Sequence, residues 1–185
     1  WERLRGTLFG VERLQPAVFV HFGSSREYWH MTAGDPELAD LCGWTAQTAA
    51  WLDGANVDGA RMVLVNAAAE GPIHTGSSPV LLMDSRLEAA AEFAGASMVA
   101  GIQTGVTLHV APDTVLHQMP VAGGQFVTRV FGLGDDPKKH WDTRGASFMN
   151  RTWVQWLVEA GVTPEQVWPH ATPSQRTLWN ARLHP

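Results

Sequence analysis

A turn rich in glycine and serine is the first place in the sequence where side chains could bind a ligand. The apolar run at residues 18–22 predicts a strand that stops at Gly23, and Ser25 can cap a helix that begins at the next residue. Amide groups at a helix start can hold a phosphate. An ordinary capped turn without a ligand is the alternative. The candidate binding residues of this turn are His21, Gly23, Ser24, Ser25 and Glu27.

Other side chains that could do chemistry are spread along the chain, and none of them identifies a catalytic residue. Lys138 follows two aspartates and could contact a phosphate, with a solvated charge cluster as the simpler interpretation. His74, His109 and His117 are 35 and 8 residues apart. This spacing does not match the ligands of trimeric β-helix zinc enzymes, so we expect surface histidines and no metal site. For the single cysteine, Cys42, we expect a buried, unreactive thiol.

The element that must position these groups is a stretch with a period of six residues. Neither a helix nor an alternating strand has this period, whereas a hexapeptide β-helix buries every sixth residue in a narrow core. The residue two places before each repeat is mostly small, which suits a tight corner. The repeat slips by one residue near Gly101 and resumes at Thr104. The repeating residues are Val57, Val63, Ala69, Thr75, Leu81, Leu87, Phe93 and Val99.

We therefore predict a mainly β fold, a single-stranded left-handed β-helix over residues 55–120. An amphipathic helix beginning at Leu87 is the alternative for part of this stretch. Residues 1–54 would hold a strand and helices that lead into the solenoid, including a helix over residues 35–54 capped by Asp35. Residues 121–185 would combine a strand from Phe126 to Phe131 with helices capped by threonines. Five of the nine tryptophans follow residue 140, so we expect this tail to cover the open end of the β-helix.

Composition limits the classes of partner. The chain has 185 residues, enough for one domain with a substantial core. Its net charge is −5 and it has no lysine or arginine cluster, which argues against nucleic acid or an anionic membrane as partner. One cysteine excludes an internal disulfide, and no signal peptide or membrane span is visible, so we expect a cytoplasmic protein. Because the chain begins at Trp1, we expect a piece of a longer polypeptide.

Three segments carry a family resemblance. The ending contains Val-Thr-Pro-Glu-Gln-Val-Trp at 162–168 and Leu-Trp-Asn-Ala-Arg-Leu at 178–183, with His184 where the family usually has phenylalanine. Residues 126–138 are similar to a pattern VTxVFGxxDDPK, and residues 18–28 to a strand–Gly–Thr/Ser–x–Glu–Phe/Tyr element. In this order the segments resemble the fucose-1-phosphate guanylyltransferase region shared by GDP-fucose pyrophosphorylases and L-fucokinases, which contains a left-handed β-helix.

The resemblance implies GMP transfer from GTP to L-fucose 1-phosphate in GDP-fucose salvage, with sugar phosphate and GTP as ligands. It implies Mg²⁺ for the complete enzyme, and an adjacent nucleotidyltransferase domain with a glycine-rich loop. This sequence shows neither that loop nor the ATP loop of the family's kinase module. We therefore expect no cofactor in this chain and no catalysis by it alone. Asn180 and Arg182 would hydrogen-bond backbone carbonyls while Leu178 and Trp179 pack on the solenoid, with substrate binding as their alternative role.

Two other function classes use the same kind of solenoid. Hexapeptide-repeat acyltransferases are trimers that bind coenzyme A or an acyl carrier between coils and use a histidine as general base. Their flanks do not usually include a helical, tryptophan-rich tail. The third possibility is a non-catalytic module that serves assembly or holds a neighbouring catalytic domain.

Overall fold

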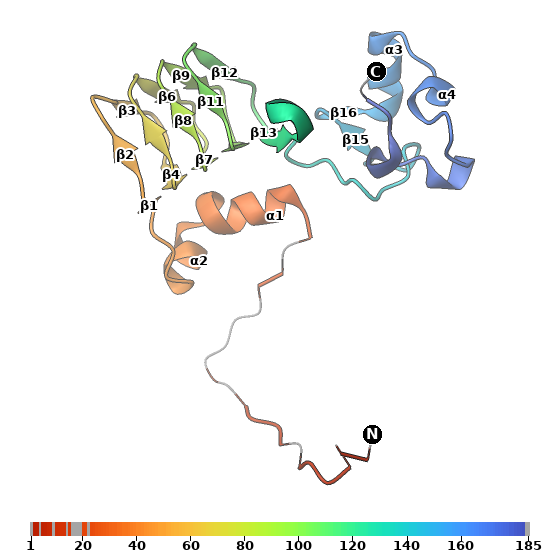
Figure 1. Ribbon diagram of the computed structural model, residues 1–185, viewed down its shortest axis with the longest axis horizontal. Coiled ribbons are helices and arrows are strands. Elements are labelled where there is room, and N and C mark those ends of the chain that lie inside the picture. The colour runs from red at the N-terminus through yellow and green to blue at the C-terminus, as the bar shows by residue number, and fades with distance from the viewer. Residues whose placement is uncertain are drawn as a thin grey trace.

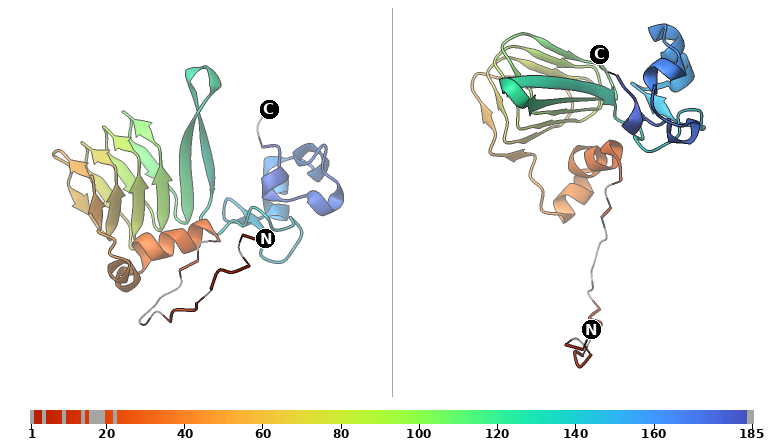
Figure 2. Two further views of the ribbon diagram at one scale, coloured as in Figure 1. Left: turned by 60° about the horizontal axis from the view of Figure 1, so that its bottom comes forward. Right: turned by 45° about the vertical axis from the view of Figure 1, so that its right-hand side comes forward.

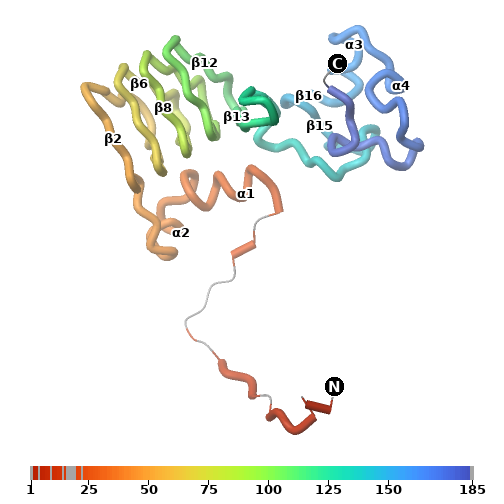
Figure 3. The backbone as a smooth tube through the Cα atoms, in the orientation of Figure 1, coloured from red at the N-terminus to blue at the C-terminus, as the bar shows by residue number. Residues whose placement is uncertain are grey.

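The computed structural model describes residues 2–3, 5–8, 10–13, 15, 20–21 and 23–183. The strand predicted at 18–22 and the family position at His184 lie wholly or mostly outside the described residues. Three parts follow one another along the chain: short helices, a coil that ends in a hairpin, and a small C-terminal unit (Figure 3). No helix of the described part is long and apolar enough to cross a membrane.

The coil is built from three parallel sheets that lie around a common core (Figure 1). Sheet A contains the parallel strands β1 (Gln47–Thr48), β4 (Met62–Val65), β7 (Val80–Met83), β10 (Ser97–Ala100) and β13 (Thr114–Val121), with an antiparallel sixth strand, β14 (Gln125–Gly132), at its edge. Sheet B contains β2 (Trp51–Leu52), β5 (Ala68–Ala69), β8 (Arg86–Leu87) and β11 (Gln103–Thr104). Sheet C contains β3 (Val57–Asp58), β6 (Ile73–Thr75), β9 (Ala91–Phe93) and β12 (Leu108–Val110).

The β-helix prediction is confirmed, but two of the repeating residues point the other way. Val63 and Leu81 lie on the outer face of sheet A and pack with Ala33 of the N-terminal helices. The turn before β7 is one residue longer than the equivalent turn before β10, and the turn before β4 is one residue shorter. Because neighbouring residues of a strand face opposite sides, a one-residue change of either sign reverses the side on which the hexad position falls. The repeating residues inside the coil include Ala69, Leu87, Phe93 and Val99.

The corner between sheets A and B has the same backbone geometry in every coil. It is occupied by residues with positive φ, namely Ala49 at 51°, Asn66 at 48°, Asp84 at 47° and Gly101 at 69°. At the equivalent place after the last coil, Gln118 continues β13 instead of turning. The chain then passes η2 (Ala122–Gly124) and returns as β14 (Gln125–Gly132), antiparallel to β13. The coil therefore ends in a hairpin, which includes the predicted strand at 126–131.

The N-terminal helices cover the outer face of sheet A. They are α1 (Ser25–Trp29), the π-helical turn η1 (His30–Gly34) and α2 (Pro36–Leu41). The Trp29 indole donates to the Pro79 carbonyl at 3.1 Å and fixes α1 against the coil. The Asp35 cap is confirmed, since its carboxylate accepts from Leu38 N at 3.0 Å. The helix predicted over 35–54 is wrong beyond Leu41, because Gly43 has a φ of 70° and the next residues form β1 and β2.

The C-terminal unit has a core of its own. It contains β15 (Ser147–Phe148), β16 (Arg151–Thr152), α3 (Trp153–Ala160), α4 (Pro164–Val167), η3 (Pro173–Gln175) and η4 (Leu178–Asn180). The predicted threonine caps are confirmed as capping boxes at Thr163 and Thr172. Phe148, Trp153 and Trp168 pack together, with ring centroids 5.1 and 4.8 Å apart. The tail is therefore not a lid on the coil, as expected from the sequence, but a unit beside the hairpin (Figure 1).

We predict that Gly101→Ala strongly destabilises the protein. A Cβ at this position would lie 2.4 Å from the Gln118 carbonyl oxygen, and the φ of 69° disfavours any side chain. We expect the free energy of unfolding to fall by about 2 kcal/mol in a chemical denaturation experiment. Gly105→Ala is the matched control, because its Cβ would meet only the Glu88 carboxylate at 3.4 Å. Equal stability of the two variants would contradict the role of this corner.

Candidate functional site

The glycine–serine turn forms the cap of α1. Glu27 accepts a hydrogen bond from Gly23 N at 2.7 Å, and Ser24 Oγ accepts one from Glu27 N at 3.2 Å. The Gly23 amide, and then the Ser24 hydroxyl, lower the pKa of Glu27. The cap is Ser24 rather than the predicted Ser25, and His21 is exposed. The Gly23 amide, which the sequence suggested for phosphate binding, is thus already bonded to the Glu27 carboxylate at the start of α1.

The helix α1 joins two other segments through Arg26. Its guanidinium lies 3.1 Å from the Asp113 carboxylate, at the last corner of the coil. It also lies against the backbone of Gly134, where an added Cβ would be 3.2 Å from Arg26 Nη2. Segment 23–28 therefore meets the turn at 132–138. We use the name junction for the turn at 132–138 together with the three segments that contact it, namely 23–28, 147–149 and the tail around Trp179.

Asp135 is the centre of the junction, and sequence reasoning missed it. Its side chain is buried, and its carboxylate accepts from Gly132 N at 2.6 Å, from Ser147 Oγ at 2.6 Å and from Met149 N at 2.8 Å. These bonds tie the base of the hairpin to β15. The first aspartate of the Asp-Asp-Pro sequence is thus a structural group inside the protein. The spacing Gly132-x-x-Asp135 predicts only the local turn. The other two hydrogen-bond donors to Asp135, Ser147 and Met149, come from a later segment.

The tail approaches the same turn from the other side. Trp179 N donates to the Pro137 carbonyl at 2.9 Å, next to the exposed Lys138. The expected carbonyl bond of Asn180 is present, since its amide donates to Gln175 O at 2.9 Å. Arg182 is exposed, and none of the hydrogen bonds found in the described part involves its guanidinium. Trp179 does not pack on the solenoid as expected, because 75% of it is exposed.

His140 holds the turn and the tail together. Its Nε2 lies 2.5 Å from the Pro173 carbonyl and its Nδ1 lies 2.5 Å from the Asp142 carboxylate. The Pro173 carbonyl, and then Asp142, raise the pKa of His140 above its ordinary value. The protonated imidazole can donate to both acceptors at once. The charge of His140 therefore strengthens its contact with the tail at Pro173.

A cavity of about 270 Å³ lies between the hairpin and the C-terminal unit, next to the junction. Asn150 in its wall donates to the Asp113 carbonyl at 2.9 Å. Arg151 pairs with Glu159. The cavity thus combines a cation, an amide and aromatic rings from separate elements, which explains why no sequence motif revealed it. Its lining includes Thr114, Val130, Asn150, Arg151 and Trp156.

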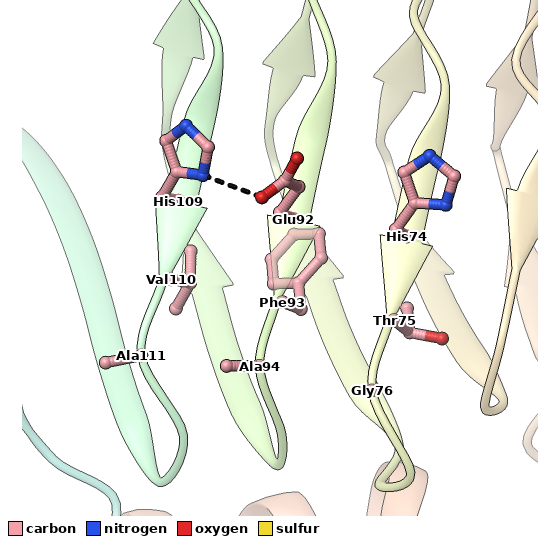
Figure 4. A pocket seen from close by; sticks show the side chains of 9 residues that line it. All are labelled: His74, Thr75, Gly76, Glu92, Phe93, Ala94, His109, Val110 and Ala111. Carbon is pink, nitrogen blue, oxygen red and sulfur yellow. Dashed lines mark hydrogen bonds and ion pairs between the residues drawn. The ribbon is translucent and has the colours of Figure 1, made fainter.

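A larger, shallower hollow of about 610 Å³ lies along sheet C and the turns that follow its strands (Figure 4). Acidic and imidazole side chains alternate from coil to coil on the outer face of this sheet: His109 Nδ1 lies 2.9 Å from Glu92 at the hollow, and His74 lies 3.9 Å from Asp58 of the preceding coil. His74 and His109 are on this surface as expected. The third histidine, His117, is in the hairpin, where burial and then Arg129 lower its pKa.

The described residues do not form a metal centre. No group of three or more histidine, cysteine, aspartate or glutamate side chains among them could hold a metal ion. Cys42 is exposed at the end of α2, so the expectation of a buried thiol is wrong.

Replacing Asp135 with alanine should destabilise the junction. Alanine has no side-chain acceptor, which leaves the N–H groups of Gly132 and Met149 without the carboxylate oxygen that they share. We expect the free energy of unfolding to fall by about 2 kcal/mol. Asp136→Ala is the control, because Asp136 is exposed and water can replace its bond to Lys138 N. The assignment fails if both variants unfold at the same denaturant concentration.

The His140 contacts predict a pH-dependent contribution to stability. A pKa raised in the folded state stabilises the protein below the unfolded-state pKa, and this contribution is lost as pH rises through the folded-state pKa. His140→Gln should therefore lower the melting temperature more at about pH 5.5 than at about pH 8.5. His170→Gln, at an exposed position, is the control. If His140→Gln lowers the melting temperature by the same amount at both pH values, the charge of His140 does not contribute to stability.

The family model of the fucose pyrophosphorylase domain matches residues 1–185 of the chain. No curated protein and no solved structure gives a significant match. The match covers the coil, the hairpin, the junction and the C-terminal unit described above. The chain belongs to the fucose pyrophosphorylase domain family.

Proposed function

We propose that this chain is the β-helix region of a protein that transfers GMP from GTP to L-fucose 1-phosphate. In this reaction a phosphate oxygen of the sugar phosphate attacks the α-phosphorus of GTP. The new P–O bond forms as the bond to the β-phosphate oxygen breaks, and pyrophosphate leaves. The product is GDP-fucose, and the reaction class is nucleotidyl transfer.

The observation that carries the proposal is the convergence of the three family-like segments. Segment 23–28 reaches the turn at 132–138 through Arg26 and Gly134, and the tail reaches it through Trp179 and Pro137. Segment 23–28 is separated from the other two by the whole coil in the sequence. A purely structural β-helix would not need to gather them at one surface. Their meeting point is therefore the part of this chain that we assign to substrate.

The proposal divides the reaction between two domains. The sheets of the described part are the three faces of the coil and the small sheet of β15 and β16. Neither a doubly wound sheet nor a glycine-rich phosphate loop is present among these residues. We assign GTP binding and catalysis to an adjacent nucleotidyltransferase domain. This chain would contribute the surface that meets the sugar phosphate.

The junction offers the two kinds of group that a sugar phosphate needs. The exposed ring of Trp179 can stack on the apolar face of a hexose ring. Lys138 is next to Trp179, because the carbonyl of the preceding residue, Pro137, accepts from Trp179 N. The ammonium group of Lys138 can bind a phosphate as a point charge. Arg182 is a further exposed cation in the same tail. Asn180 is held on a backbone carbonyl, which leaves it a positioning role.

Isothermal calorimetry on the chain tests this assignment. We expect heat on titration with L-fucose 1-phosphate and none with GTP. Trp179→Ala and Lys138→Ala should each weaken the affinity about tenfold, the equivalent of losing one stacking or one charge-assisted contact. Trp51→Ala is the matched control, because Trp51 is 52% exposed on β2, in the coil rather than at the junction.

Two results would contradict the proposal. Absence of heat with both ligands would leave this chain with only a structural role. Binding of coenzyme A instead would favour the acyltransferase class. Either result would be independent of the stability of the variants, because it concerns the unchanged chain.

A further inference from the structure

Strand β14 is the outer edge of sheet A, and no described strand pairs with its far side. Its eight residues contain one charged side chain, Arg129, and no proline. Edge strands are normally protected by several charges, by proline or by a bulge, because their free backbone groups attract another strand. β14 has little of this protection.

The hydrogen bonds of the hairpin show which backbone groups face the free edge. Leu133 N donates to Asp113 O at 2.6 Å, and these residues are directly opposite in the hairpin register. In an antiparallel pair, alternate residues bond to the neighbouring strand. The odd-numbered residues of β14 therefore bond to β13. The N–H and C=O groups of Phe126, Thr128 and Val130 point to the free edge.

Among the described residues, no second layer lies beneath the outer half of the hairpin. The coil turns away at Gly101, whereas β13 runs straight on at Gln118, and the hairpin rises above the coils (Figure 2). Apolar side chains on this part are exposed, with 59% of Phe126 and 40% of Val121 accessible. A two-stranded ribbon is marginally stable in water by itself. Pairing with a further strand would therefore stabilise it.

The order of side chains around Thr128 is complementary to a second copy of the same strand. Phe126 and Val130 lie two residues before and after Thr128, so the three side chains share one face. In an antiparallel pair centred on Thr128, each Phe126 faces Val130 of the other copy, and the two threonines face each other. Aromatic–β-branched and threonine–threonine pairs stabilise antiparallel sheets. Arg129 then faces Val127, so the charges do not meet.

We infer that the chain forms a two-fold symmetric dimer through antiparallel pairing of β14 with β14 of a second copy. Phe126, Thr128 and Val130 supply the backbone hydrogen bonds, and Thr128 lies at the two-fold axis. The contact is self-complementary, as closed symmetry requires. It joins the two copies of sheet A into one continuous sheet. The inference does not rest on sugar phosphate binding at the junction.

Size-exclusion chromatography with light scattering on the full chain tests the dimer. We expect a concentration-dependent mass that approaches twice the 20.2 kDa of the chain. Thr128→Pro removes the outward N–H but no bond to β13, a position where an edge strand tolerates proline. It should raise the dissociation constant at least about tenfold. Thr128→Val keeps the amide and a β-branched side chain and should weaken the dimer far less than Thr128→Pro, and far-UV circular dichroism checks that both variants are folded.

A cysteine crosslink tests the register. In a Cys42→Ser background, Thr128→Cys should give a disulfide-linked dimer with oxidised glutathione, because opposite Cα atoms of a hydrogen-bonded pair are about 5.5 Å apart. Arg129→Cys, whose side chain lies on the other face, should not. A monomer at all concentrations, a trimer, a Thr128→Pro dimer as tight as the unchanged one, or equal crosslinking at both positions would overturn the inference.

Discussion

The stacking of each coil on the next in one register is the constraint on which the rest of the structure depends. Backbone hydrogen bonds run from coil to coil, so every strand and every corner must lie over its equivalent. The left-handed corner at Asn66, Asp84 and Gly101 repeats because any other backbone path would break these bonds. The coil ends where Gln118 departs from this path. The hairpin, and with it the approach of the C-terminal unit, follow from that single departure.

The junction shows how a rigid coil can gather distant segments. The N-terminal helices lie along sheet A and bring Arg26 to the last corner. The hairpin returns the chain to the same place, where the buried Asp135 ties it to β15. The stacked strands of the coil therefore hold the N-terminal helices and the hairpin at a fixed separation.

The sequence predicted the elements that depend on local order or on a regular period. The hexad repeat predicted the coil, and Thr163 and Thr172 predicted the caps of the short C-terminal turns. It did not predict that Val63 and Leu81 face outward, because a fixed count of six does not show that one turn is a residue shorter and another a residue longer. The partners of Asp135 and the cavity beside Arg151 come from segments far apart in the chain. The exposure of Trp179 depends on the C-terminal unit having a core of its own. These features follow from tertiary packing, which no local pattern records.

The identical corner in successive coils has a consequence for how this family can vary in size. Each coil contacts only the coils before and after it, so the energy of stacking is a property of neighbouring pairs. Duplication or deletion of one whole turn of the solenoid, from one corner to the next, would preserve every type of contact inside it. Such a change would alter the span between the N-terminal end of the coil and the hairpin by one strand spacing, about 4.8 Å. The solenoid is thus an adjustable spacer, whose length can change in evolution by whole coils.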